Sequence, residues 1–259
     1  MNLHFYKYQG TGNDFVIIDN RSIDFPKENS ALIRQLCDRR FGIGADGLIL
    51  LEPSESADFR MIYYNADGNE SSMCGNGGRC IVAFAKKLGI ITKHTTFDAV
   101  DGLHEATIEH GIVSLRMIDI TEVDTFIKHT FIDTGSPHHV EFRENIDALD
   151  VKSEGSKIRN GAPYFEAGSN VNFATQKDEN SFKVRTFERG VEDETLACGT
   201  GVTAVALAAH ANKLTTSNSI RLEVMGGNLE VSFNVKDGNY TEVYLKGPAE
   251  FVFSGTIEI

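Results

Sequence analysis

The sequence predicts an α+β protein of two pseudo-symmetric domains, each a mostly antiparallel sheet curved around a central buried helix. Three observations lead to this prediction: an internal repeat, two helical runs that are apolar on every side, and tight turns between alternating apolar runs. With 259 residues, the chain exceeds the usual size of one hydrophobic core and can form two domains.

The repeat relates the two halves of the chain at a nearly constant spacing. Residues 70–77 align with residues 194–201, and the glutamate, the cysteine and both glycines coincide at a shift of 124 residues, from Cys74 to Cys198. Two further matches occur in the same order: Thr11-Gly12-Asn13 with Thr134-Gly135-Ser136, and the strand-like residues 59–63 with residues 183–187. Three ordered matches indicate a duplicated domain.

Local patterns predict the elements of each half. Residues 3–8, 15–20 and 47–52 are predicted as short strands, and residues 30–40 as a helix that stops at Gly42. Tight hairpin turns are predicted at Asp101-Gly102, Gly226-Gly227 and Asp237-Gly238, which lie between alternating apolar runs. Most of the sheet is therefore expected to be antiparallel.

A helix is predicted directly after each repeated Cys-Gly pair. Residues 81–85 and 202–209 are apolar at helical spacing in every direction, and a helix without a polar face must be buried all round. Gly89 is predicted to end the first helix, and the second is predicted to fray near Asn212. Cys74 and Cys198 then lie at the N-termini of the two central helices.

The charge balance excludes some partners. The chain carries 37 acidic and 25 basic residues, a net charge of -12, without a compensating stripe of Lys and Arg. Such a surface repels nucleic acid and anionic membranes. The first residues lack the basic-then-apolar pattern of a secretory signal, and the most apolar run is too short to span a bilayer. We therefore expect a cytoplasmic protein with no nucleic-acid or membrane partner.

Four cysteines, Cys37, Cys74, Cys80 and Cys198, have different expected roles. Structural disulfides are not expected in this compartment. Zinc is a poor interpretation because five residues separate Cys74 from Cys80 and no Cys-His cluster completes a tetrahedral set, so no metal is predicted. Cys37 and Cys80 lie inside helical runs and are predicted to be packing residues.

Cys74 and Cys198 are candidates for chemistry because of where they lie. The first turn of a helix presents unpaired N–H groups and the positive end of the helix dipole, which stabilise a thiolate. The glycines that follow each cysteine let a ligand approach the backbone, and a carboxylate is the natural guest. One cysteine before a buried helix is usually a packing residue, but two related by duplication favour a function. If a pseudo-twofold axis relates the halves, an acid and a base face one carbon from opposite sides, as stereochemical inversion requires.

Further motifs surround both cysteines. They are Gly10-Thr11-Gly12-Asn13-Asp14-Phe15, Phe41-Gly42-Ile43-Gly44-Ala45-Asp46, Asn65-Ala66-Asp67-Gly68, Cys74-Gly75-Asn76-Gly77-Gly78-Arg79, Pro137-His138, Asn170-Val171-Asn172-Phe173, Glu188-Arg189-Gly190, Ala197-Cys198-Gly199-Thr200-Gly201 and Gly247-Pro248-Ala249. Together they resemble the diaminopimelate epimerase family over the whole chain. The resemblance implies interconversion of LL- and meso-diaminopimelate in lysine biosynthesis, without pyridoxal phosphate or any other cofactor. It also implies a homodimer, and a last strand that returns to the first domain, so the expected domains are 1–123 with 250–259, and 124–249.

The resemblance also implies roles for individual residues. Cys74 and Cys198 resemble the two bases, and the backbone N–H groups around Gly75, Asn76, Gly199 and Thr200 resemble the carboxylate site. The polar residues that resemble the family's substrate-binding set are Asn13, Asn65, Asn170, Glu188 and Arg189. His138 and Glu188 resemble residues that modulate the cysteines.

Each polar residue also has a simpler interpretation. Considered singly, Asn13 and Asn65 are turn formers, Glu188 and Arg189 could be a solvated ion pair, and His138 could be an ordinary loop residue.

Three positions depart from the family pattern. Ser136 replaces an asparagine, Gly47 stands where some members have a substrate-contacting glutamine, and Asn69 replaces a serine. These three departures affect expected contacts to the substrate, so the sequence does not predict the affinity for it.

Other functions remain possible at this point. Proline and hydroxyproline racemases share the two-cysteine mechanism and duplicated fold, but their substrates offer no second carboxylate to Glu188-Arg189. The phenazine-pathway isomerases lack the paired cysteines. A thiol-based redox protein would form a disulfide between Cys74 and Cys198, but no Cys-x-x-Cys motif supports it.

Overall fold

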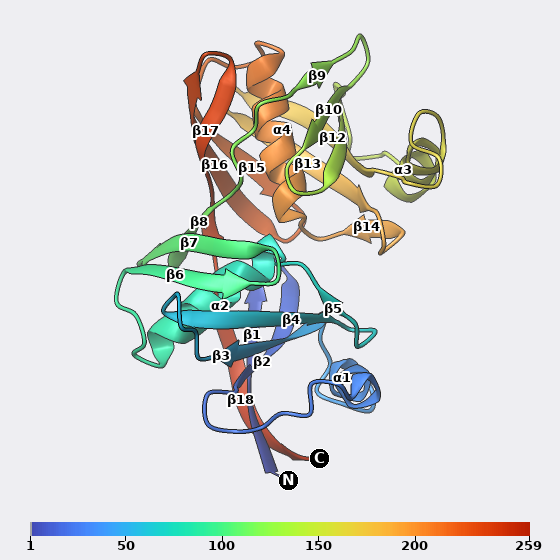
Figure 1. Ribbon diagram of the computed structural model, residues 1–259. Coiled ribbons are helices and arrows are strands. Elements are labelled where there is room, and N and C mark those ends of the chain that lie inside the picture. The colour runs from blue at the N-terminus through green and yellow to red at the C-terminus, as the bar shows by residue number, and fades with distance from the viewer. Residues whose placement is uncertain (1) are drawn as a thin grey trace. The chain divides into compact units, whose positions relative to one another are not determined.

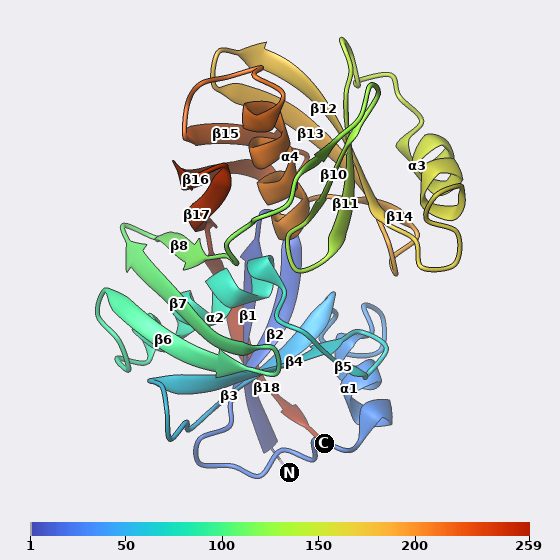
Figure 2. The same cartoon turned by 45° about the horizontal axis from the view of Figure 1, so that its top comes forward.

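The computed structural model describes residues 2–259 and separates into two compact units. The first unit runs to Leu115 and includes Gly247–Ile259, and the second is Arg116–Lys246. Figure 1 and Figure 2 show each unit as strands gathered around one helix, α2 (Gly75–Lys87) in the first and α4 (Gly199–Ala211) in the second.

The first unit contains nine strands and two helices among the residues described. The strands are β1 (Asn2–Gly10), β2 (Asn13–Asp19), β3 (Gly47–Glu52), β4 (Phe59–Asn65), β5 (Glu70–Ser71), β6 (His94–Ala99), β7 (Gly102–Glu109), β8 (Ile112–Arg116) and β18 (Glu250–Glu258). They pair in the order β18–β1–β2–β3–β4–β6–β7–β8, with β5 also on β4. Only β2–β3 and β4–β6 are parallel in this series. Helix α1 (Ser30–Cys37) connects β2 to β3, and α2 connects β5 to β6.

The second unit repeats this plan. Its strands are β9 (Asp124–Thr125), β10 (Thr130–Asp133), β11 (Pro137–Phe142), β12 (Asn170–Asp178), β13 (Ser181–Glu188), β14 (Asp193–Thr195), β15 (Ser219–Val224), β16 (Gly227–Lys236) and β17 (Asn239–Pro248). They pair in the order β9–β10–β11–β12–β13–β15–β16–β17, with β14 also on β13, and the parallel pairs are β11–β12 and β13–β15. Helix α3 (Val151–Asn160) connects β11 to β12, and α4 connects β14 to β15. The predicted α+β fold with two pseudo-symmetric domains is confirmed.

In the first unit the sheet is buried on both faces. Leu48 and Leu50 of β3 join the core cluster that includes Ile33 of α1. Ile49, between them, points to the opposite face, where its side chain lies against Gly77 of α2. A strand packed between two helices buries the side chains on both of its faces, so its sequence is a continuous apolar run. The sequence of β3, Gly-Leu-Ile-Leu-Leu-Glu, has this pattern.

In the second unit α3 covers the face of the sheet opposite α4. Val151 of α3 packs with Val171 and Phe173 of β12 and Phe187 of β13. A side chain at Gly155 would overlap the Phe187 ring, so the glycine allows α3 to approach the sheet. Helix α4 is buried along Val202–Ala209, as the absence of a polar face predicted.

A hairpin forms at each predicted turn, but in two of them the turn residues are shifted by one: Ala99 pairs with Gly102 and Val224 pairs with Gly227, so Gly102 and Gly227 already belong to the following strands. Asp237 and Gly238 have φ of 52° and 82° between β16 and β17, as a type I′ hairpin requires. Gly89 follows the end of α2 with φ of 73°.

The helix predicted over residues 30–40 ends earlier, at Cys37. The Asp38 carboxylate accepts the N–H groups of Arg40 and Phe41, both at 2.7 Å, and so replaces helical hydrogen bonds with a local turn. Within residues 2–259, no helix combines the length and apolarity that a membrane span needs.

Candidate active site

The two repeated cysteines occupy equivalent positions in the two units. Cys74 is the N-cap of α2 and Cys198 is the N-cap of α4, both with extended backbone. Their carbonyls accept the first helical hydrogen bonds, from Gly78 at 2.7 Å and from Val202 at 3.0 Å. The N–H groups at 75–77 and 199–201 precede those bonds, so each helix start is suited to hold an anion beside a thiol.

The Cys74 thiol has an oriented acceptor. Its Sγ donates to Asn13 Oδ1 at 3.6 Å, and Asn76 Nδ2 donates to the same oxygen at 3.2 Å. Asp46 fixes this orientation, because its carboxylate accepts from Asn13 Nδ2 at 2.7 Å. The structure therefore brings Asn13, Cys74 and Asn76 together.

A network of charged side chains holds Asp46 in turn. Arg39 bridges Asp46 and Asp14, each at 2.7 Å, and Lys7 pairs with Asp14 at 2.7 Å. Burial raises the pKa of Asp14, but hydrogen bonds and charges from Arg39 and Lys7 outweigh it and hold that pKa well below its usual range. Asp46 had no role predicted from the sequence, because nothing in its motif Gly44-Ala45-Asp46 shows that the carboxylate reaches Asn13.

Cys198 lies in a more enclosed position, with 7% of its surface exposed. Its Sγ lies 3.5 Å from Thr200 Oγ1, and Thr134 Oγ1 donates to the Thr200 carbonyl at 3.0 Å. A side chain at Gly201 would overlap Asn172 Oδ1 and would lie 3.3 Å from Cys198 Sγ. The sheet therefore closes directly against the first turn of α4.

Two predicted residues of the second unit lie side by side on adjacent strands. His138 of β11 and Asn170 of β12 are register partners. His138 is fully buried, and burial together with the positive charge of Arg189 lowers its pKa to about 3. The predicted modulating residue is therefore a neutral histidine.

Both the nitrogen and the oxygen of the Asn170 side-chain amide form hydrogen bonds within the protein. Its Nδ2 donates to Ser136 Oγ at 2.9 Å and to the Pro137 carbonyl at 3.1 Å, and its Oδ1 accepts from the Arg189 N–H at 2.9 Å. Ser136, which departs from the family pattern, thus bonds Asn170 directly. In this structure Asn170 positions the Glu188-Arg189 segment.

Matches to known proteins cover nearly the whole chain. The family model described as diaminopimelate epimerase matches residues 5–115 and 130–252. The diaminopimelate epimerase of Flavobacterium psychrophilum is 62% identical over 253 residues, 97% of this chain and 99% of that protein. That of Chlorobaculum tepidum is 47% identical over 260 residues, 96% of this chain and 99% of that protein. The chain belongs to the diaminopimelate epimerase family.

Solved structures outside the diaminopimelate epimerase family share the fold. A phenazine biosynthesis protein of the PhzF family from Bacillus anthracis gives a TM-score of 0.79 at 14% identity, covering 100% of both chains. A probable proline racemase from Agrobacterium radiobacter K84 gives a TM-score of 0.71 at 15% identity, covering 99% of this chain and 93% of that one. At these identities the likeness shows the fold alone.

The remaining predicted residues of this diaminopimelate epimerase family member lie at strand ends. Asn65 ends β4 opposite Gly47 on β3, and its backbone bonds Asn69 in a turn. A Cβ on Gly47 would lie 2.5 Å from the Tyr63 ring, so that ring takes the space a longer side chain would need. Glu188 accepts from Thr195 Oγ1 at 3.1 Å. Arg189 donates to the Ala167 carbonyl at 2.9 Å.

The other cysteines are packing residues, as predicted. Cys37 and Cys80 are buried, and burial raises the pKa of each thiol to about 12, which keeps both protonated at neutral pH. Across the described chain, residues 2–259, no group of three or more His, Cys, Asp or Glu is arranged to hold a metal.

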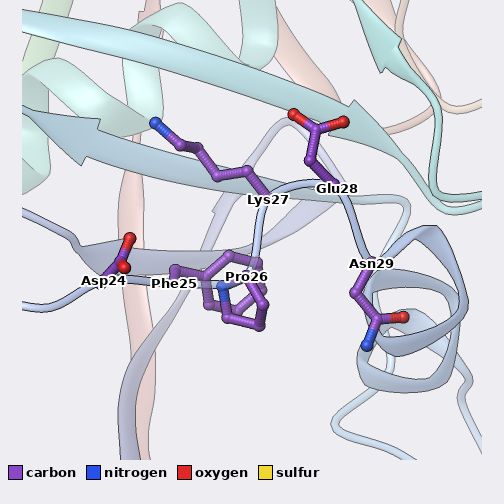
Figure 3. A pocket seen from close by; sticks show the side chains of 6 residues that line it. All are labelled: Asp24, Phe25, Pro26, Lys27, Glu28 and Asn29. Atoms are coloured by element: carbon purple, nitrogen blue, oxygen red, sulfur yellow. The ribbon is translucent and has the colours of Figure 1, made fainter.

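A surface hollow lies away from the candidate site residues. Asp24, Phe25, Pro26, Lys27, Glu28 and Asn29 line it, in the loop before α1 (Figure 3). None of these residues belongs to the candidate site.

Proposed function

We propose that this chain interconverts LL- and meso-diaminopimelate by proton transfer at one α-carbon, with Cys74 and Cys198 as the acid–base pair and no cofactor. The observation that carries the proposal is the duplicated N-cap cysteine, in a chain of the diaminopimelate epimerase family. The domains are proposed as 1–123 with 250–259, and 124–249, in a cytoplasmic homodimer that serves lysine biosynthesis.

The chemistry follows from two thiols in opposite protonation states. One cysteine, as thiolate, takes the α-proton, so the Cα–H bond breaks and its electron pair stays on the α-carbon. The other, as thiol, gives its proton to the opposite face and becomes the thiolate. N–H groups at Gly75, Asn76, Gly199 and Thr200 would hold the α-carboxylate and stabilise the developing negative charge.

The distal end of the substrate carries a second ammonium and carboxylate. Arg189 can grip a carboxylate with two parallel hydrogen bonds, and Glu188 can accept from an ammonium. Asn13 and Asn65 in the first unit and Asn170 in the second complete the proposed binding set. His138 and Glu188 are proposed to modulate the cysteines.

The first test is exchange with solvent. Reduced protein in D2O, without added cofactor, should place one deuterium at the inverted α-carbon of diaminopimelate, measured by proton NMR and mass spectrometry. Proline, supplied in parallel, should not exchange. Absence of exchange by folded, reduced protein would refute the proposal, and exchange with proline alone would move the chain to a racemase activity.

Cysteine variants separate the two-base mechanism from other thiol chemistry. Cys74→Ala and Cys198→Ala should each abolish complete epimerisation. Cys37→Ala is the matched control, because it removes a buried thiol from the packing cluster of α1, and it should retain activity. Full activity in either of the first two variants would remove the two-base model.

A further inference from the structure

His138 and its neighbours lie on one face of the sheet in the second unit. His138 and Val140 of β11 point to the same face, and the β11–β12 register places Asn170 and Asn172 beside them. Thr186 of β13 is the register partner of Asn172. His138 and Asn172 each have 0% of their surface exposed, so every polar atom there needs a partner within the protein.

The orientation of the Asn172 amide is fixed by the His139 carbonyl, which cannot donate, and the Thr186 hydroxyl is satisfied by the same orientation. Its Nδ2 lies 3.1 Å from the His139 carbonyl, which can only accept a hydrogen bond. Its Oδ1 accepts from Thr186 Oγ1 at 2.9 Å. A flipped amide would set two oxygens against each other at the His139 carbonyl, so the assignment of nitrogen and oxygen follows from the network.

This orientation determines which nitrogen of His138 carries the proton. The second N–H of Asn172 Nδ2 points to His138 Nδ1 at 3.1 Å, so Nδ1 must accept and cannot hold a proton. The proton of the neutral ring is then on Nε2. A doubly protonated ring would place two donors against each other, in addition to the burial and the Arg189 charge that already oppose it.

The other ring nitrogen of His138, Nε2, differs from Nδ1 because it has no acceptor among the described residues. Within residues 2–259 it is buried without a hydrogen-bond partner. A buried donor left unsatisfied costs about 1–3 kcal/mol, so proteins rarely retain one without a use. Asn172, which holds the ring, lies against Gly201 and beside Cys198 at the first turn of α4.

We propose that Asn172 is a positioning residue that fixes His138 as the neutral Nε2–H tautomer, so that His138 serves as a hydrogen-bond donor to an anion and not as a proton acceptor. The anion is a carboxylate oxygen of the substrate or the Cys198 thiolate, and this part rests on the proposed function. The tautomer itself does not depend on the function. Thr186 and the His139 carbonyl support Asn172 from behind.

The tautomer can be read directly from ring nitrogen spectra. In protein with ¹⁵N-labelled histidine, and with His138→Gln to assign the signal, we expect a protonated Nε2 with a one-bond N–H coupling and a non-protonated Nδ1 at pH 7. A proton on Nδ1, or on both nitrogens, overturns the proposal. This measurement uses ligand-free wild-type protein, so it stands whether or not the protein epimerises diaminopimelate.

Variants test the role of Asn172. Asn172→Asp replaces the donor with an acceptor, so the proton should move to Nδ1 and kcat/KM should fall about 10- to 100-fold, the loss of a hydrogen bond to a charged group. Thr186→Val is the matched control: it removes a buried hydroxyl from the same network but leaves Asn172 Nδ2 on the His139 carbonyl, so the tautomer should stay. An unchanged tautomer in Asn172→Asp overturns the proposal, and if that variant does not fold, the wild-type spectrum still decides.

A ligand titration identifies the acceptor. Addition of meso-diaminopimelate should shift the Nε2 proton downfield. If the shift persists in Cys198→Ser, the acceptor is the substrate carboxylate; if it needs Cys198, the acceptor is the thiolate. No shift in either protein, with binding confirmed by calorimetry, overturns the donor role.

Discussion

At the scale of single residues, Arg79 is a buried cation on α2, five residues after Cys74. Arg79 is fully buried, yet its guanidinium donates only to neutral acceptors: the Pro248 and Gly75 carbonyls, Thr11 Oγ1 and Asn76 Oδ1. No carboxylate within residues 2–259 pairs with it. A buried cation without a counter-ion is costly, and negative charge on Cys80 or Cys74 would compensate it. Burial keeps Cys80 protonated, so we expect Cys74 to be that anion. We therefore expect Asn13 to stabilise the thiol form of Cys74 and Arg79 to stabilise its thiolate form, as the proposed alternation between acid and base requires.

Removing this charge should make Cys74 harder to ionise. Because a nearby cation favours a thiolate, Arg79→Gln should shift the alkylation of Cys74 by iodoacetamide to higher pH and reduce epimerisation at pH 7 by about tenfold or more. Rates are measured by mass spectrometry across pH. Lys86→Gln is the control, since it removes an exposed cation from the last turn of the same helix. Identical alkylation profiles for Arg79→Gln and wild type would show that Arg79 is only a packing residue.

At the scale of elements, the first turn of each central helix is set by how closely the sheet approaches it. Gly77 of α2 faces Ile49, Met61 and Phe15 at 3.2–3.5 Å from where its Cβ would be. Gly201 of α4 has less room, because its Cβ would overlap Asn172 Oδ1. Small residues at the helix start therefore keep the cysteine, the N–H groups and the polar side chains of the sheet together.

A methyl group at Gly201 should damage the site more than the fold. Alanine favours the helix interior over glycine by about 1 kcal/mol, which offsets part of the strain. The methyl must nevertheless displace the Asn172 amide, and a misplacement of about 1 Å near a reacting centre can cost about 100-fold in rate. Gly201→Ala should therefore lose kcat with a small change in the urea midpoint.

Gly89→Ala provides the opposite case. Gly89 has φ of 73° and open space around its Cβ direction, so alanine there should lower stability by about 1 kcal/mol and leave kcat unchanged. Equal loss of kcat in both variants would contradict this distinction.

At the scale of the whole molecule, the duplication explains what the sequence could predict. Cys-Gly-x-Gly, the apolar helices and the hairpin turns are local patterns, and the two units show them in the same order. Helix α3 was not predicted: its packing face has glycine at position 155, where Phe187 fills the space, so the apolar periodicity is interrupted. Asp46, Asn172 and Arg79 received no role because their partners lie on elements distant in sequence, and only the folded register brings them together. The catalytic and substrate-binding assignments stay predictions.

The buried neutral histidine should also appear in the stability of the whole chain. His138 has an ordinary pKa of 6.5 when unfolded and about 3 when folded, so between these values the unfolded state binds a proton that the folded state does not. The contribution of the neutral His138 to the free energy of unfolding is therefore fully present above about pH 6.5 and is lost as the pH drops towards 3.

His138→Gln keeps a side chain that can accept from Asn172 but does not titrate, so its urea midpoint should fall less than that of wild type between pH 7 and about 4. His94→Gln, at an exposed position on β6, should follow the wild-type curve. Parallel curves for His138→Gln and wild type would mean that folding does not lower the pKa of His138, so that the folded ring accepts a proton despite the Asn172 N–H group that faces its Nδ1.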